Sequence, residues 1–280
     1  MPELPEVETI VRRLKYGTDD HPPVPGHTIN DVRVFWDRII QEPDPITFKD
    51  RLLGRTILNV GRRGKFLHFP LDHGHLIGHL RMSGDMRMEP ALTSDKHPLP
   101  EEKYDQVILD MVGDWRLVFS SIRKFSRMWF VEDPQRVFGD LGPEPLSPDF
   151  SPELLFKMLH KHRRQLKPLL MDQTFIAGLG NIYSDEALFS AKIHPLRRSE
   201  TLSKEEAVAL FNGIRKVLNT GIENFGASLD WMYRGGQFQN SFKVHQREAQ
   251  HCPECDAKII KLTVGQRSTY ICPRCQQLLS

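Results

Sequence analysis

Long hydrophobic runs are absent from this sequence of 280 residues. No apolar stretch approaches the roughly 20 residues that a membrane-spanning helix requires, which argues against an integral membrane protein. The first eight residues hold three glutamates and no apolar segment, so they lack the composition of a secretory signal. We therefore expect an intracellular protein of the cytoplasm.

The sequence also has little net charge, with a formal value of +2. This small value conceals a difference between the two halves of the chain. Residues 1–145 hold 20 Lys and Arg against 23 Asp and Glu, whereas residues 146–280 hold 18 against 13. A basic C-terminal half favours a polyanionic partner.

Internal repeats and low-complexity tracts are absent as well, and the length allows two domains. Apolar residues at three- and four-residue steps predict a helix over residues 1–15. Alternating apolar residues between 27 and 133 predict strands, including a hairpin that turns at Gly113-Asp114. The proline-rich stretch 139–152 is the expected domain boundary.

The pattern after that boundary is helical. Ser151-Pro152 is expected to open one helix. The glycine turn Gly178-Leu179-Gly180 leads into a second helix, over residues 182–191. Ser203 and Glu206 have the spacing of a capping box that starts a third.

Cysteine is scarce, and all four cysteines lie close together near the C-terminus. Two residues separate Cys252 from Cys255, and two separate Cys272 from Cys275, with sixteen residues between the pairs. This spacing predicts a zinc site. Four thiolates close a tetrahedral shell and leave no position for water or substrate, so the metal would be structural. Two disulfides are the alternative, which the cytosolic redox balance disfavours.

The sequence between the cysteine pairs predicts a hairpin. Its strands are expected at residues 258–263 and 268–271, with Gly265-Gln266-Arg267 at or near the turn. A guanidinium at such a tip is well placed to hold phosphate, because its fork matches two oxygens. A solvated turn arginine is the other interpretation of Arg267.

The N-terminal sequence MPELPEVE is explained only in part by the predicted helix. Pro5 suits the first helical position, and Glu6 complements the positive end of the helix dipole. Pro2 and Glu3 precede the helix and contribute nothing to its apolar stripe.

Three separated segments together resemble the formamidopyrimidine-DNA glycosylase (Fpg) family of bacterial 8-oxoguanine repair enzymes. They are MPELPEVE at the start, GLGNIYSDEALF from Gly178 and GQRSTYICPRCQ from Gly265. The segments RRGKFL, HLRMSG and LKPLLMD extend the match over nearly the whole chain in the family's order. The resemblance implies an α+β multidomain fold. Its parts would be an N-terminal catalytic β-sandwich begun by a helix (1–140), a helix-two-turn-helix DNA-binding domain (150–238) and a Cys₄ zinc finger (243–280).

The resemblance also implies a chemistry for the N-terminus. Met1 would be removed, and the secondary amine of Pro2 would attack C1′ of a damaged nucleotide to form an iminium. Glu3 would act as acid and base, Glu6 would orient the amine or cap the helix, and Lys65 would contact the phosphate beside the lesion. The enzyme would release an oxidised purine and then cut the strand by β- and δ-elimination.

The same resemblance implies residues that hold double-stranded DNA while the damaged nucleotide is flipped out. Met82, Arg123 and Phe125 match the family's void-filling trio, although SIRKFS around Arg123 departs from the common DPRRFG-like string. Core packing is the alternative for Met82 and Phe125, and a surface lysine is the alternative for Lys65.

Further positions match family residues near the DNA backbone and the nucleotide. Asn181 and Arg267 would bind neighbouring phosphates, and Lys167 would do likewise. Glu186 matches the acidic residue near the flipped nucleotide, and its place on the helix does not settle whether it faces the site or solvent. We expect one structural zinc ion, a monomer, and association with the nucleoid.

Two other functions are considered. A zinc-finger protein could bind damaged DNA on the same scaffold without catalysis, and a relative of the endonuclease VIII branch would remove oxidised pyrimidines. The leucine in PELPE resembles the 8-oxoguanine branch more closely, because the other branch tends to carry glycine there. The segment 226–247 is expected to include the loop that closes over the base, and it looks a few residues shorter than usual.

Overall fold

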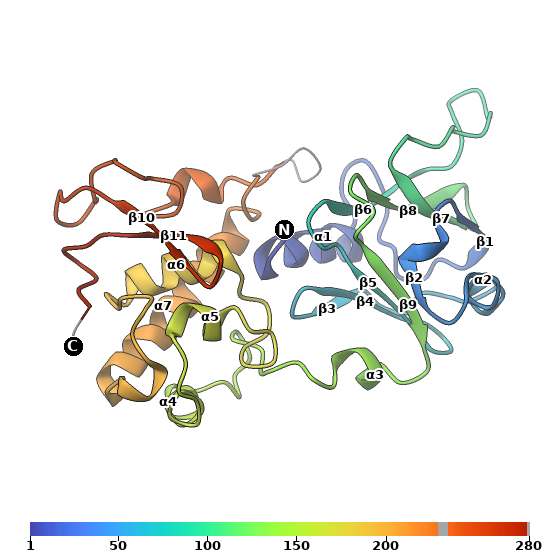
Figure 1. Ribbon diagram of the computed structural model, residues 1–280. Helices are drawn as coiled ribbons and strands as arrows, with labels where there is room; N and C mark the ends of the chain where they lie inside the picture. The colour runs from blue at the N-terminus through green and yellow to red at the C-terminus, as the bar shows by residue number, and fades with distance from the viewer. Residues whose placement is uncertain (229–234, 279–280) are drawn as a thin grey trace. The chain divides into compact units, whose positions relative to one another are not determined.

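The computed structural model describes residues 1–228 and 235–278, and these form two compact units (Figure 1). The first unit comprises Met1–Pro2 and Glu6–Gly139, together with Ser228 and Gly235. The second comprises Glu3–Pro5 and the described parts of Asp140–Ala227 and Gly236–Ser280. The helical part and the finger thus share one unit, and the division into three domains at residues 140, 150, 238 and 243 stays a proposal.

The first unit contains two β-sheets. The four-stranded sheet has the order β1 (Ile29–Val34), β7 (Asp105–Met111), β8 (Trp115–Ser121), β6 (Gly84–Pro90). The five-stranded sheet has the order β2 (Ile40–Glu42), β9 (Arg127–Val131), β5 (His75–His79), β4 (Phe66–Pro70), β3 (Gly61–Arg63). Neighbouring strands are antiparallel except for β2 and β9, which are parallel.

One hydrophobic core joins the two sheets, which confirms the predicted β-sandwich. Leu109 and Phe119 of the first sheet belong to the same buried cluster as Leu76 and Phe130 of the second. The predicted hairpin is also confirmed, since Met111 pairs with Trp115 across Gly113 and Asp114. Val112, Gly113 and Asp114 form the turn, and Gly113 and Asp114 have positive φ.

Helices surround this core. Helix α1 (Leu4–Tyr16) contributes its apolar stripe to the sandwich core through Val7, Ile10, Val11 and Leu14. Two shorter helices, α2 (Pro45–Leu52) and α3 (Gln135–Phe138), and the 3₁₀ turn η1 (Asp37–Ile39) complete the unit. Asp44 caps α2, because its carboxylate accepts the amide N–H groups of Ile46 and Thr47.

The second unit is built on four helices, α4 (Pro152–His160), α5 (Leu166–Leu170), α6 (Asn181–Ser190) and α7 (Lys204–Glu223), with the 3₁₀ turns η2 (Ser199–Thr201) and η3 (Phe238–Ser241). Ser151 caps α4 as expected, and Ser203 and Glu206 form the predicted capping box of α7. Helix α6 starts at Asn181, directly after the predicted glycine turn.

The C-terminal hairpin pairs β10 (Ile260–Val264) with β11 (Arg267–Ile271). Gly265 and Gln266 form its turn, both at positive φ. Arg267 is therefore the first residue of β11, paired with Val264 rather than placed in the turn. Among the described residues, none of the helices has the length and apolar character to cross a membrane.

Two histidines of the sandwich stay neutral when the protein is folded. The amide N–H of Arg81 donates to Nδ1 of His79 at 3.0 Å, so the ring proton lies on Nε2. Burial, helped by the charges of Arg81 and Lys65, lowers the pKa of His79 to about 3. Burial and the neighbouring His75 lower the pKa of His68 to about 4.

These lowered pKa values predict a loss of stability in mild acid. The unfolded chain takes up protons near pH 6.5, the model value for histidine, whereas the folded rings do so only near pH 4 or below. The unfolded state therefore binds more protons in between, and the free energy of unfolding falls as the pH is lowered from about 6.5 towards 4. We expect the free energy of unfolding of the His79→Gln variant to fall less steeply with pH than that of the wild type, by about 1.4 kcal/mol per pH unit. Urea unfolding between pH 7.5 and 4.5 measures it, with the exposed His97→Gln as control, and a curve for His79→Gln that parallels the wild type would contradict it.

Candidate active site and nucleic-acid interface

The carboxylate of Glu3 lies at the start of α6. Its Oε2 accepts the amide N–H of Gly180 at 2.7 Å and that of Tyr183 at 3.4 Å, and its Oε1 accepts the N–H of Ile182 at 2.9 Å. The side chain is thus held by the first N–H groups of a helix, where the backbone dipoles favour negative charge. Glu3 is only 3% exposed. Its carboxylate is fixed in place by backbone groups.

The loop before α6 is shaped to receive the N-terminal residues. The amide N–H of Leu4 donates to the carbonyl of Gly178 at 3.0 Å. Gly178 has a φ of +94°, and a Cβ there would lie 2.6 Å from Leu4 Cδ1. Gln173 holds this loop by accepting the N–H of Gly178 and donating to the carbonyl of Leu179. The predicted glycine turn therefore has a role that its spacing does not reveal, which is to bind residues 3 and 4.

Gly180 gives the Glu3 carboxylate the space it occupies. A Cβ at Gly180 would lie 2.4 Å from Cδ of Glu3 and 2.6 Å from its Oε1. Such separations are far below van der Waals contact, so only glycine fits here beside this carboxylate.

Pro2, Glu6 and Lys65 belong to the first unit and all three are buried. Lys65, 3% exposed, follows Gly64 in the turn between β3 and β4. The positive charge of Lys65 helps to lower the pKa of His79, the last residue of β5. The adjoining strand is tied to α1, because Arg62 Nε donates to Glu8 at 2.8 Å.

Met82, Arg123 and Phe125 lie together in two turns of the sandwich. Met82 is 41% exposed and Phe125 is 54% exposed, so core packing is not their role. The guanidinium Nη1 of Arg123 lies 3.6 Å from the sulfur of Met82, and the Arg123 N–H donates to Ser83. Two large apolar side chains and a guanidinium are thus presented to solvent on neighbouring turns.

Lys167 requires a correction. Its side chain is completely buried, and its Nζ donates to Asp185 Oδ1 at 2.6 Å, Thr269 Oγ1 at 2.7 Å and the Ser268 carbonyl at 3.0 Å. All three ammonium protons are used inside the protein, so a phosphate contact from Lys167 does not fit this geometry. Burial lowers the pKa of Lys167, and the Asp185 carboxylate opposes that shift.

Glu186 faces the protein interior. Its Oε1 accepts the amide N–H groups of Lys243, Val244 and His245 at 2.8–3.1 Å, and its Oε2 accepts that of Lys243 at 2.9 Å. Burial raises its pKa, and these backbone donors oppose the rise. Glu186 thus fastens the segment that enters the finger, and its place near the flipped nucleotide stays a prediction.

Asn181 contacts the strand residue that follows Arg267. Asn181 Nδ2 donates to the Ser268 carbonyl at 3.1 Å, while Asn181 Oδ1 has no hydrogen-bond partner among the described residues. Arg267, next to Ser268, is exposed at the tip of the hairpin. The amide group at the first turn of α6 is therefore bonded to the backbone of β11 at the residue next to the exposed Arg267.

The segment that we expect to close over the base, 226–247, lies partly outside the described residues, because 229–234 are not described. The chain before residue 229 and the chain after residue 234 are joined by backbone hydrogen bonds. Gln237 N–H donates to Asn224 at 2.8 Å, and Phe238 N–H donates to Gly226 at 2.9 Å. The ring of Phe238 stacks on Tyr183 of α6, with the centroids 5.0 Å apart.

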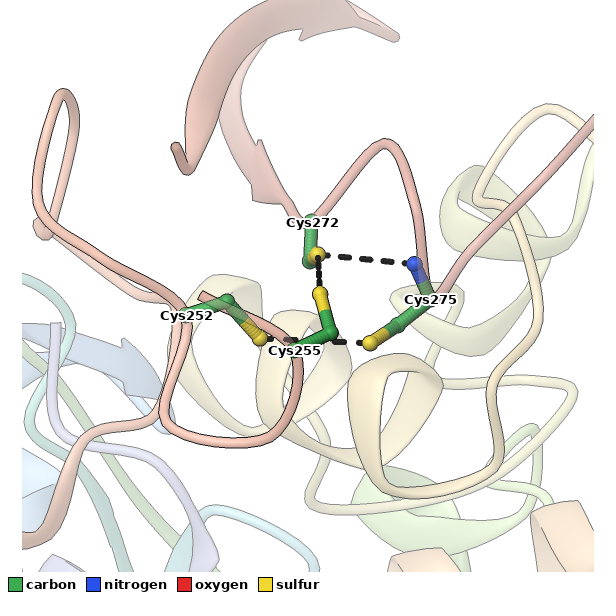
Figure 2. A group of neighbouring side chains, drawn as sticks. All are labelled: Cys252, Cys255, Cys272 and Cys275. Atoms are coloured by element: carbon green, nitrogen blue, oxygen red, sulfur yellow. Dashed lines mark hydrogen bonds between the residues drawn. The ribbon is translucent and has the colours of Figure 1, made fainter. Parts of the chain in front are cut away.

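The four cysteine thiols converge on one point (Figure 2). All four sulfurs lie within 4.8 Å of one another. The separations are 3.9 Å for Cys252 and Cys275 and 3.3 Å for Cys255 and Cys272, too long for disulfide bonds. Tetrahedral Zn²⁺ at about 2.3 Å from each sulfur would separate the sulfurs by about 3.8 Å. The residues therefore fit one structural zinc ion.

Models of three protein domains match this chain in sequence. The Formamidopyrimidine-DNA glycosylase N-terminal domain matches residues 1–128, the Formamidopyrimidine-DNA glycosylase H2TH domain matches 141–231, and the zinc finger found in FPG and IleRS matches 250–278. The last match confirms the predicted zinc finger.

Whole proteins match as well. The formamidopyrimidine-DNA glycosylase of Pelotomaculum thermopropionicum is 40% identical, over 99% of this chain and 100% of that protein. The crystal structure of the Lactococcus lactis Fpg with DNA that contains an abasic site has a TM-score of 0.88 and 34% identity. The complex of Lactococcus lactis Fpg (MutM) with DNA that contains Fapy-dG has a TM-score of 0.87 and 34% identity. Each of these two comparisons covers 99% of this chain and 100% of the other. The chain belongs to the formamidopyrimidine-DNA glycosylase family.

Proposed function

We propose that this chain removes oxidised purines, formamidopyrimidines and 8-oxoguanine, from double-stranded DNA through a covalent bond to Pro2. Membership of the family makes it a base-excision repair enzyme, a DNA glycosylase and abasic-site lyase. One observation carries the assignment of residues. The carboxylate of Glu3 is fixed by three backbone N–H groups of α6, directly after the proline whose amine would react.

The chemistry begins at the N-terminus. Met1 is half-exposed, so a peptidase can reach it and leave Pro2 with a secondary amine. The amine nitrogen attacks C1′, the bond from C1′ to the base breaks, and the base leaves with the electron pair and gains a proton. The ammonium formed by the attack gives its proton to the Glu3 carboxylate, and Glu3 passes that proton to the ring oxygen of the sugar. The bond from C1′ to the ring oxygen then breaks, and an iminium joins Pro2 to C1′.

Strand scission follows from the charge on the iminium. It acidifies the C2′ proton, whose removal expels the 3′ phosphate, and the next elimination expels the 5′ phosphate. Glu3 is the group in place to accept and return these protons. Lys65 is proposed to bind the phosphate beside the lesion.

The remaining residues hold the DNA. Met82, Arg123 and Phe125 are proposed to fill the gap that the flipped nucleotide leaves, since exposed thioether, guanidinium and aromatic groups can all stack on bases. Asn181 and Arg267 are proposed to bind adjacent phosphates. The protein would act as a monomer on chromosomal DNA, and so be found with the nucleoid.

Borohydride trapping tests this proposal. We expect a covalent adduct with duplexes that contain 8-oxoguanine, a formamidopyrimidine or an abasic site. A variant extended by Gly-Ser ahead of Pro2 has an amide in place of the amine, and should bind an abasic analogue yet form no adduct. Strand scission by the extended variant would contradict the role of Pro2.

The same assay separates the other functions. A wild-type protein that binds the abasic analogue and forms no adduct would be a sensor of damage. Faster adduct formation with oxidised pyrimidines than with oxidised purines would place the chain with the endonuclease VIII branch in substrate choice.

A further inference from the structure

A buried polar cluster lies behind the residues proposed to bind phosphate. Its centre is Asp185 of α6, a residue that the sequence did not mark as functional and whose side chain is completely buried. Asp185 Oδ1 accepts from Lys167 Nζ at 2.6 Å. Its Oδ2 accepts from His245 Nδ1 at 2.8 Å and from the Tyr270 N–H at 3.4 Å. One carboxylate thus connects α5, α6, the segment that enters the finger, and β11.

Lys167 extends this cluster to the hairpin tip. Its other two protons bind the Ser268 carbonyl and the Thr269 hydroxyl of β11. The Ser268 carbonyl also accepts from Asn181. The two β11 residues that follow Arg267 are therefore held directly by the buried lysine.

The other side of the hairpin turn also lies against α5. A Cβ at Gly265 would lie 3.2 Å from Cγ of Pro168, the residue after Lys167. The turn is thus fixed to α5 at Gly265 and again at Ser268, and Arg267 lies between these two points.

A buried ion pair of this kind is weak support for stability, because desolvation of both charges offsets their attraction. What it can provide is orientation, since each partner has fixed hydrogen bonds to a different element. We propose that Asp185 and Lys167 are positioning residues that set the place of Arg267 and Asn181 against neighbouring phosphates of the DNA backbone. This inference rests on the proposed function, in which Arg267 binds phosphate.

The test replaces both charges with apolar groups of similar size, in the double variant Lys167→Met/Asp185→Leu. The replacement leaves the net charge unchanged and leaves no unpaired buried charge. The exposed pair Arg51–Glu132 provides a matched control, Arg51→Met/Glu132→Leu. Binding to a duplex with an abasic analogue is measured over a range of salt concentrations. Each lost phosphate contact lowers the slope of log K against log salt by about one.

We expect the slope of the buried-pair variant to fall by about one, as in Arg267→Ala, and the control slope to stay at the wild-type value. Adding Arg267→Ala to the buried-pair variant should produce no further fall, because both changes remove the same contact. The KM for excision should rise about tenfold with a smaller change in kcat. Three results would each overturn the proposal. They are a wild-type slope in the buried-pair variant, a further fall in slope when Arg267→Ala is added to it, and a wild-type slope in Arg267→Ala alone.

Zinc content and the thermal midpoint are measured alongside. If the double variant loses zinc or does not fold, Asp185→Asn takes its place. That variant keeps the shape of the side chain and removes the charge that holds Lys167. Its slope of log K against log salt is then judged by the same criteria. Binding needs no covalent chemistry, so a wild-type protein that forms no adduct would refute the proposed function while this test still gives its answer.

Discussion

Replacing Gly180 with alanine is expected to reduce base excision by about 10²- to 10⁴-fold, the usual contribution of a positioned acid–base group. The new Cβ would lie 2.4 Å from the carboxyl carbon of Glu3, so the carboxylate must leave its place at α6. The clashing atoms are the end of a flexible side chain, and Gly180 has a φ of −136°, which alanine can adopt. The fold should therefore survive while the acid–base group moves. Single-turnover excision from an 8-oxoguanine duplex measures the loss.

Two comparisons isolate the role of Glu3 in that loss. Gly61→Ala, at a strand position with open space around the new Cβ, should have wild-type activity. Glu3→Gln should be as slow as Gly180→Ala, and the double variant no slower than either. Activity of Gly180→Ala within a few-fold of the wild type would show that the carboxylate does not need this position.

Loss of zinc is expected to have the next largest effect, through the hairpin. The hydrophobic cluster of the finger has only five buried members, Phe189, Val244, Cys252, Ile259 and Cys272. Two of these are metal ligands. Because structural zinc supplies about 10–16 kcal/mol in finger peptides, so small a cluster cannot hold the hairpin without it. Cys272→Ser should bind no zinc. Arg267 should then no longer be held in position, and the variant should bind abasic-site duplex at least tenfold more weakly.

Metal analysis and fluorescence anisotropy measure these two effects, with the exposed Gln277→Ala as control. The helical core should persist, since Leu169, Leu188, Leu210 and Leu218 form a separate cluster. Far-UV circular dichroism should therefore change little. Full affinity for DNA in a zinc-free variant would contradict the role given to the finger.

The fold could be predicted largely from local patterns. The hairpin at Gly113-Asp114, the capping box at Ser203 and the cysteine spacing each depend on residues close together in the chain, and all three are confirmed. The turn of the finger lies at Gly265 and Gln266, and Arg267 directly follows it, as the prediction of a place at or near the turn allows.

The interior roles of Asp185, Glu186 and Lys167 could not be predicted in the same way. Helix α6 is buried on all sides from Ile182 to Phe189, so its charged residues carry no periodic signal that separates inward from outward positions. Their partners lie at the far end of the chain, 58 residues from Glu186 in the case of Val244 and 102 from Lys167 in the case of Thr269. Such pairs become visible only in three dimensions.

The joined ends of the segment between Gly226 and Phe238 have a consequence for how relatives diverge. Backbone hydrogen bonds and the Phe238–Tyr183 stack hold both ends, and Glu186 fastens the chain again before the finger. The entropy of closing a loop changes slowly with its length. Changes of length between these anchors should therefore leave the metal-bound hairpin undisturbed.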